Sequence, residues 1–192
     1  MSDLAPKKRA TVVDLLALPE DAGMELIDGE IVRKALPTFK HGRRQVRVAI
    51  ALASFDRERR DDLGGWWIVT EVDVEYSEYD TFRHDVSGWR RERLATEPEE
   101  FPVKTRPDWV CEIISKSNRA NDTVRKFRAL QKHGVQHYWL LDMEHQTLTV
   151  FRWQKDGYLA VQNVCPGDKA SLEPFSGVES DVSSLFGIEP SC

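Results

Sequence analysis

The stretch RPDWVCEIISKSN, residues 106–118, places an aspartate, a glutamate and a lysine within a few residues of one another. Carboxylates bind hard cations such as Mg²⁺, and a bound cation can polarise a phosphate and activate a water molecule. The spacing is wrong for one shared site, because Asp108 and Lys116 each lie four residues from Glu112. Four residues along a strand span about 13 Å, so we expect Asp108 to begin a strand and not to share an ion with Glu112.

Glu112 is the most informative carboxylate in the chain. Its neighbours at 110–114 are otherwise apolar or cysteine, which is typical of a central strand covered on both faces. A carboxylate is costly to bury there unless it is paired or binds a metal. Asp85, in the preceding predicted strand, is the natural partner, because carboxylates on adjacent strands can share one cation. The alternatives are a salt bridge from Glu112 to an arginine and an exposed position for Asp85.

Three further residues could complete such a site. Lys126 lies on the helix predicted after the Glu112 strand, whereas Lys116 lies where that strand is already turning. The alternative for Lys126 is a solvated side chain paired with Asp122, four residues earlier. His41 begins a long predicted helix, whose N-terminus attracts phosphate, but it could equally be a capping or surface residue. Glu25 is either an edge-strand charge or part of the pocket.

The elements that must position these residues follow from the hydrophobic pattern and the turn residues. The predicted helices are 11–18, about 41–60, 121–133 and a helical turn at 183–186. The predicted strands are 66–76, 82–89, 108–115 and 135–142, with hairpins around Asp28-Gly29 and Asp156-Gly157. Residues 90–106 are expected to form a surface loop. The apolar residues that recur at helical spacing are Val46, Ala49, Ile50 and Ala53 in the long helix, and Val124, Phe127 and Leu130 in the later one.

The order of these elements predicts an α/β fold. A third strand that crosses over a helix to a fourth indicates a mixed central sheet flanked by helices, with extra hairpins near both ends of the chain. The 192 residues suit one domain, 11–188, after a disordered tail at 1–10. We also expect a cytoplasmic protein without membrane contact. No apolar run approaches the roughly 18 residues of a span, residues 1–10 are not a secretory signal, and three scattered cysteines suit a reducing compartment.

The charges are distributed unevenly along the chain. The net charge is −5, so a general affinity for nucleic acid is not implied. Residues 33–47 nevertheless contain six lysines and arginines and no acid, and residues 116–132 contain six against the single acid Asp122. Solvated helix faces account for either cluster about as well. Together the clusters flank the carboxylates and would form a local surface that attracts phosphate.

Several of these blocks in combination resemble the Uma family of restriction-endonuclease-like proteins, over about residues 12–188. The segments that carry the resemblance are MELIDGEIV at 24–32, His41, HDVSGWRRERL at 84–94, PDWVCEIIS at 107–115 and DTVRKFRALQKHGVQHYWLLD at 122–142. This family is similar to a branch of the PD-(D/E)xK nucleases. The resemblance implies a restriction-endonuclease-like fold and Mg²⁺-dependent hydrolysis of DNA, with Mn²⁺ as a possible substitute.

The resemblance also implies roles for individual residues. The implied catalytic residues are Asp85, Glu112, Lys126, His41 and Glu25. Asp85, Glu112 and the backbone carbonyl of Ile113 would bind the metal. The basic residues expected to contact phosphate are Lys40, Arg43, Arg44, Lys116, Arg119 and Arg125. A homodimer is expected by analogy with related nucleases. The alternative is a catalytically silent nucleic-acid- or protein-binding domain that keeps the fold.

The sequence departs from the family pattern at three places. The usual proline before the first aspartate is His84, the Ser-Pro-Ser after the glutamate strand reads Ser115-Lys116-Ser117, and the proline-rich segment before His41 is reduced to Pro37. The first two changes lie at the edges of the implied site. They leave open whether activity is retained and whether Lys116 takes the role of Lys126.

Overall fold

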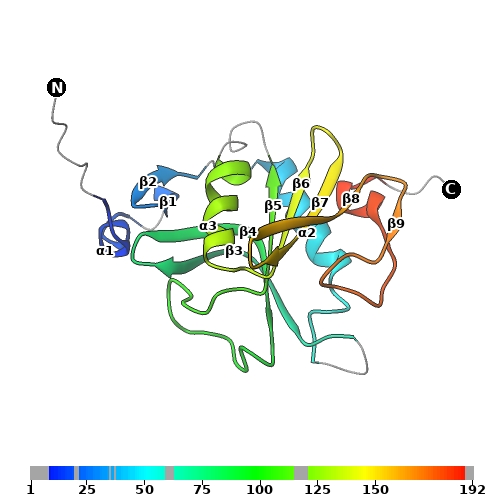
Figure 1. Cartoon of the computed structure of the whole chain (residues 1–192), viewed down its shortest axis with the longest axis horizontal. Helices are drawn as coiled ribbons and strands as arrows, with labels where there is room; N and C mark the ends of the chain where they lie inside the picture. The colour runs from blue at the N-terminus through cyan, green and yellow to red at the C-terminus, as the bar shows by residue number, and fades with distance from the viewer. Residues whose placement is uncertain are drawn as a thin grey trace.

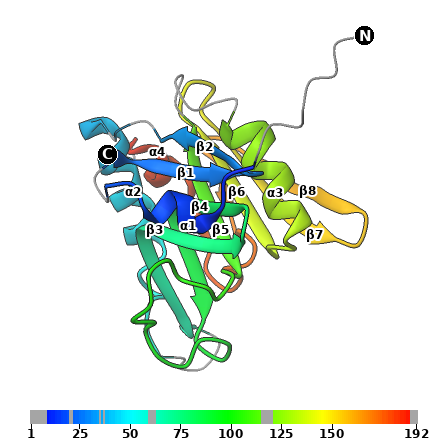
Figure 2. The same ribbon diagram turned by 90° about the vertical axis from the view of Figure 1, so that its left-hand side faces the viewer.

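The structure is a computed structural model, and its description covers residues 9–19, 22–34, 36, 38–58, 63–114 and 121–188. Its centre is one eight-stranded sheet in the order β2-β1-β4-β5-β6-β7-β8, with β3 paired to β4. Helices cover both faces of this sheet (Figure 1). In the perpendicular view, α3 lies on one side of the central strands and α2 on the other (Figure 2).

The first elements are close to those predicted. Helix α1 (Val12–Leu16) has Thr11 as its N-cap in a capping box with Asp14. Strands β1 (Met24–Ile27) and β2 (Glu30–Arg33) form a hairpin whose turn residues, Asp28 and Gly29, have φ values of 53° and 74°. These left-handed values are what a two-residue hairpin turn requires. Helix α2 (Phe39–Ala51) begins after its N-cap, Thr38, and ends well before residue 60, so the predicted C-terminal boundary is wrong.

The remaining elements follow the predicted order. Strands β3 (Trp66–Ser77), β4 (Asp80–Arg90) and β5 (Trp109–Ile114) precede the π-helix η2 (Asn121–Lys126), which continues into helix α3 (Phe127–Lys132). Strands β6 (His137–Asp142), β7 (Thr147–Gln154) and β8 (Gly157–Val164) complete the large sheet. The last elements are β9 (Lys169–Ala170), β10 (Ser180–Asp181) and helix α4 (Val182–Phe186).

The sheet is mixed, as predicted. Strands β5 and β6 are parallel, and the chain crosses between them through η2 and α3. The other pairs of the large sheet are antiparallel. The β1–β2 hairpin extends one edge and the β7–β8 hairpin the other, which confirms the expected hairpins at both ends. Of the helices described, none is both long enough and apolar enough to cross a membrane.

Strand β4 pairs with different partners along its length. It pairs with β5 at residues 86–88 and with β1 only at Thr81. Between these points, residues 82–84 pair with β3 on one side, and no described strand pairs with residues 82–85 on the other. The sheet therefore opens between β1 and β5. The backbone groups that face this gap need other hydrogen-bond partners, because unpaired buried peptide groups are costly.

The core consists of two layers separated by the central strands. Trp109, Cys111 and Ile113 face a cluster formed with α2, α4 and the loop that carries Phe175. Val110 faces the opposite cluster, with Leu130 of α3. This alternation follows from the two-residue period of a strand. It explains why β5 is apolar on both faces and why a charged side chain at Glu112 stands out.

In two helices the apolar spacing does not match the buried face throughout, although Leu130 is buried and Phe127 packs against the same core cluster, as predicted. Val46 and Ile50 of α2 are 52% and 64% exposed, while Gln45 and Val48 face inward. Val124 is 44% exposed, and among the described side chains of η2 the buried one is Lys126. A π-helix has a wider turn than an α-helix, so a 3.6-residue period assigns its inner face incorrectly. For α2, the inward face is the one that carries polar contacts to the sheet.

The Trp109→Ala variant tests the larger core layer. Trp109 is fully buried against Trp139 and Phe175, with ring centroids 5.1 and 5.0 Å away. We expect the substitution to lower the free energy of unfolding by about 3–5 kcal/mol, measured by denaturant unfolding, because it removes a large side chain and leaves a cavity. The half-exposed Leu159 provides the control, and Leu159→Ala should cost below about 1 kcal/mol. Equal losses in the two variants would contradict this account of the core.

Candidate active site

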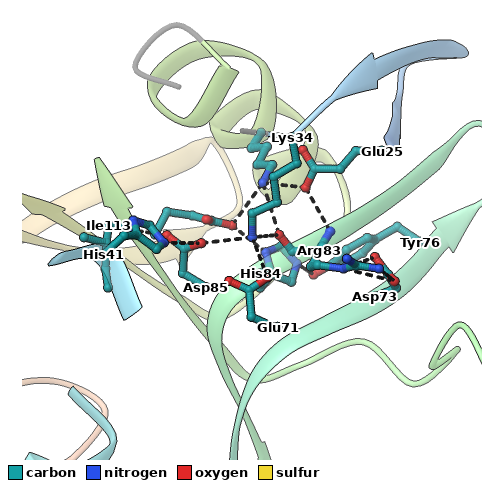
Figure 3. A network of polar contacts seen from close by, with 12 residues as sticks. Glu25, Lys34, His41, Glu71, Asp73, Tyr76, Arg83, His84, Asp85 and Ile113 are labelled. Atoms are coloured by element: carbon teal, nitrogen blue, oxygen red, sulfur yellow. Dashed lines mark hydrogen bonds and ion pairs between the residues drawn. The ribbon is translucent and has the colours of Figure 1, made fainter. Parts of the chain in front are cut away.

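Charged side chains occupy the gap between β1 and β5 (Figure 3). The Arg83 N–H donates to Glu25 Oε1 at 2.9 Å, and the Arg83 carbonyl accepts from Lys34 Nζ at 3.0 Å and Lys126 Nζ at 3.3 Å. The Ile113 N–H donates to Asp85 Oδ2 at 2.8 Å. Side chains thus satisfy backbone groups that a continuous strand ladder would have paired.

Asp85 is buried and receives two cationic groups on one oxygen. Lys34 Nζ lies 2.9 Å and His41 Nε2 lies 3.2 Å from Asp85 Oδ1. Burial alone would raise the pKa of Asp85, but the hydrogen bond from His41 and the charge of Lys34 outweigh it and hold the pKa well below its ordinary value. The carboxylate is therefore ionised at neutral pH. The same contact raises the pKa of His41 above its ordinary value.

Glu112 is buried on the neighbouring strand and receives a histidine and a lysine. His84 Nδ1 lies 2.7 Å and Lys126 Nζ lies 3.5 Å from Glu112 Oε1. Burial alone would raise the pKa of Glu112, but the charge of Lys126 and the contact with His84 lower it. Because an ionised carboxylate only accepts, Nδ1 of His84 carries the proton, and Nε2 lies 2.8 Å from the Tyr76 hydroxyl. His84 thus orients Glu112.

Lys126 connects the helix to both strands. Its ammonium group lies 2.8 Å from Glu25 Oε1, and both side chains are buried. Glu25 is therefore part of the buried network and not an exposed charge on an edge strand. The side chain of Asp122, the alternative partner of Lys126, lies outside the described residues. Lys116 and Arg119 also lie outside them, so the structure makes no comparison between Lys116 and Lys126.

Three residues of this cluster were not singled out from the sequence. Lys34 Nζ also lies 3.2 Å from Glu71 Oε2, and Gln45 Nε2 donates to Glu71 Oε1. Glu71 has a φ of 55°, and the β3–β4 register omits it between Thr70 and Val72. Left-handed backbone is uncommon outside glycine, and here it accompanies a side chain turned towards the cluster. The alternating pattern of β3 does not predict that the Glu71 side chain turns towards the cluster. Lys34 was not singled out because it is one of several basic residues in its part of the sequence.

The donor groups of this cluster suit a hard divalent cation. His41, Glu71 and Asp85 each offer a ligand atom, and these atoms lie within 4.8 Å of one another. In the described part of the network, four carboxyl groups meet two lysine ammonium groups; the carboxyl groups belong to Glu25, Glu71, Asp85 and Glu112. Glu71 is partly exposed and the other three carboxyl groups are buried, and an excess of carboxyl over ammonium groups in such a largely buried network favours binding of a cation. The Ile113 carbonyl faces the same side as its N–H, because both groups of a strand residue point one way.

The other residues singled out from the sequence lie in different surroundings. Asp108 accepts from the Arg90 N–H at 2.8 Å and from Arg93, so it holds the entry to β5, as expected. Arg125 Nη2 donates to Glu30 at 2.9 Å and to the carbonyl of Ile27. Arg44 lies against Gly187, where an added Cβ would come within 2.1 Å of its Nη1. Lys40 and Arg43 are exposed on α2.

The contact between His41 and Asp85 makes stability depend on pH. A histidine whose pKa rises on folding stabilises the folded state fully below about 6.5, its unfolded value, and this contribution disappears as pH rises through the folded value. In metal-free protein, NMR titration should give His41 a pKa above about 6.5, and Asp85→Asn should lower it. Asp108→Asn, which neutralises a buried aspartate elsewhere, is the matched control and should leave it unchanged. A His41 pKa that does not respond to Asp85→Asn would refute the contact.

The sequence and the fold of this chain are similar to those of known proteins. Residues 12–183 match the Uma2 family, described as "Putative restriction endonuclease". A crystal structure titled as "a putative nuclease belonging to DUF820" from Anabaena variabilis is similar, with a TM-score of 0.73 and 23% identity, covering 92% of this chain and 97% of that one. This similarity confirms the predicted fold. The search of curated proteins found no match. By the match over most of its length, the chain belongs to the Uma2 family of restriction-endonuclease-like proteins.

Proposed function

We propose that the protein is a Mg²⁺-dependent endonuclease that hydrolyses phosphodiester bonds of DNA, and that Mn²⁺ can replace Mg²⁺. The observation that carries this proposal is the buried cluster in which four carboxyl groups meet two lysine ammonium groups, in a gap of the central sheet. Membership of a family described as restriction endonucleases supports the same reaction class. A cytoplasmic location and a homodimer, whose two sites would serve two strands, belong to the proposal as well.

Asp85, Glu112 and the Ile113 carbonyl would hold the metal. His41 and Glu71 could add two further ligands, because one ligand atom of each lies within 4.8 Å of one of Asp85. A bound Mg²⁺ supplies charge for the phosphate and lowers the pKa of an attacking water. His84 Nδ1, 2.7 Å from Glu112 Oε1, holds this carboxylate in place.

The two lysines would act on the reacting groups. Lys126 is held between Glu25 and Glu112, where its ammonium group can orient a water molecule or stabilise negative charge that develops in the transition state. Glu25 positions Lys126 and does not itself need to touch the substrate. Lys34 adds a second positive charge beside Asp85. Both ammonium groups are fixed on the carbonyl of Arg83, which reduces the reorganisation needed during the reaction.

The phosphate backbone would meet the basic residues near this site. Lys40 and Arg43 are exposed on the helix that carries His41, so they are the best placed of the described residues. Arg44 and Arg125 already contact protein groups and would have to exchange them for phosphate. Lys116 and Arg119 remain part of the proposal on sequence grounds.

Metal binding by isothermal calorimetry tests the ligand assignment. Wild-type protein should bind Mn²⁺, and Glu112→Gln and Asp85→Asn should each weaken binding by at least about 10-fold, because each removes a charged donor while keeping the side-chain shape. Asp108→Asn is the matched control and should bind Mn²⁺ like the wild type. If the control and the site variants lose affinity equally, these two carboxylates are not the metal ligands.

Plasmid nicking tests the chemistry. Lys126→Met keeps much of the buried stem but removes the ammonium group, so nicking with Mg²⁺ or Mn²⁺ should slow by about 100-fold or more. Circular dichroism would show that the variant is folded. A wild-type protein that binds DNA and metal but never cuts would favour the silent binding domain over the nuclease.

A further inference from the structure

Leu36 and Phe39 are the two most exposed large apolar side chains of the described residues, at 78% and 85%. They lie in the sequence between Lys34 and His41. Lys34 Nζ and His41 Nε2 both contact Asp85 Oδ1, at 2.9 and 3.2 Å. In the sequence, Leu36 and Phe39 therefore lie between two residues whose side chains contact the same carboxylate oxygen of the candidate active site.

Basic residues accompany this exposed apolar pair. Lys40 and Arg43 are exposed on α2, and residues 33–47 contain no acid. An exposed aromatic ring with basic neighbours suits single-stranded nucleic acid, because bases stack on aromatic faces while lysine and arginine contact the phosphates.

The geometry of α2 indicates which nucleotide would reach Phe39. Residues two apart on a helix do not face each other, so Phe39 points away from the direction in which His41 meets Asp85. A base stacked on Phe39 would belong to a nucleotide beside the reacting phosphate, not to the reacting position itself.

We propose that Phe39, together with Leu36, forms a stacking subsite for an unpaired base that flanks the hydrolysed bond. This inference rests on the proposed function and adds the form of the substrate: DNA with unpaired bases near the cut, as in a single strand, an overhang or a loop. A base inside a duplex is already stacked on its neighbours, so it could use this subsite only after leaving the helix.

The competing occupant is a second copy of the chain. The outer face of α2 continues from Phe39 to Val46 and Ile50, both exposed, and a dimer could cover this face. Two copies packed there with Phe39 at the centre, about a two-fold axis near the first turn of α2, would bring the same basic residues, Lys40 and Arg43, close together, which costs free energy. Nucleic acid instead complements this charge.

Binding of labelled oligonucleotides, measured by fluorescence anisotropy in EDTA so that no strand is cut, tests the subsite. Phe39→Ala should weaken binding of single-stranded DNA by about 10-fold, and Phe39→Trp should preserve it. Binding of a duplex of the same sequence should change less. Ile50→Ala is the matched control, because it removes a similarly exposed apolar group from the same face about 16 Å further along the helix. A strand containing 2-aminopurine should show stacking quenching with wild type but not with Phe39→Ala.

The outcomes separate this inference from the proposed function. It is overturned if wild type does not bind single-stranded DNA, if Phe39→Ala binds it as wild type does, or if Ile50→Ala weakens binding equally. It is also overturned if sedimentation shows that Phe39→Ala only dissociates a dimer. A wild type that stacks a base on Phe39 but never cuts with Mg²⁺ or Mn²⁺ upholds the subsite and removes the nuclease. A wild type that cuts normally while Phe39 has no effect removes the subsite alone.

Discussion

The gap between β1 and β5 is the constraint on which the rest of this structure depends. Where β4 changes partners, the peptide of Arg83 and the N–H of Ile113 lack a paired strand on one side, and Glu25, Lys34, Asp85 and Lys126 bind them instead. Each charged group satisfies a backbone group and an opposite charge at once. Removing one partner would leave a buried charge without compensation, so the cluster holds together as a unit.

The same cluster decides how two helices lie on the sheet. His41 and Gln45 reach Asp85 and Glu71 from the inner face of α2, and this turns the apolar Val46 to solvent. On the other side of the sheet, η2 adopts a π-helical turn and buries Lys126 against Glu25 and Glu112. In both helices, contacts between charged groups outweigh the burial of an apolar side chain. A buried charge without a partner costs more than one exposed valine.

Buried ion clusters are poor sources of stability, because the cost of removing charges from water offsets much of their attraction. An apolar core layer such as that around Trp109 stabilises a fold more simply. A charged cluster with more carboxyl groups than ammonium groups at the centre of the sheet therefore contributes little to stability, and this agrees with the proposed chemical role. The position of the cluster between the sheet and the first turn of α2 also places exposed groups, Lys40 and Phe39, next to it in the chain.

Much of the fold was determined by local sequence. Alternation defined β3, the Asp28-Gly29 turn defined the first hairpin, and an apolar run around Glu112 marked a central strand, because these signals depend on neighbours along the chain. The sequence also named Asp85, Glu112, Lys126, His41 and Glu25, which the structure places in one network. Only the tertiary structure decided that Lys34, Glu71 and Gln45 join them. Their inclusion depends on a left-handed residue in β3 and on the opening of the sheet, and both are set by contacts between segments far apart in the chain.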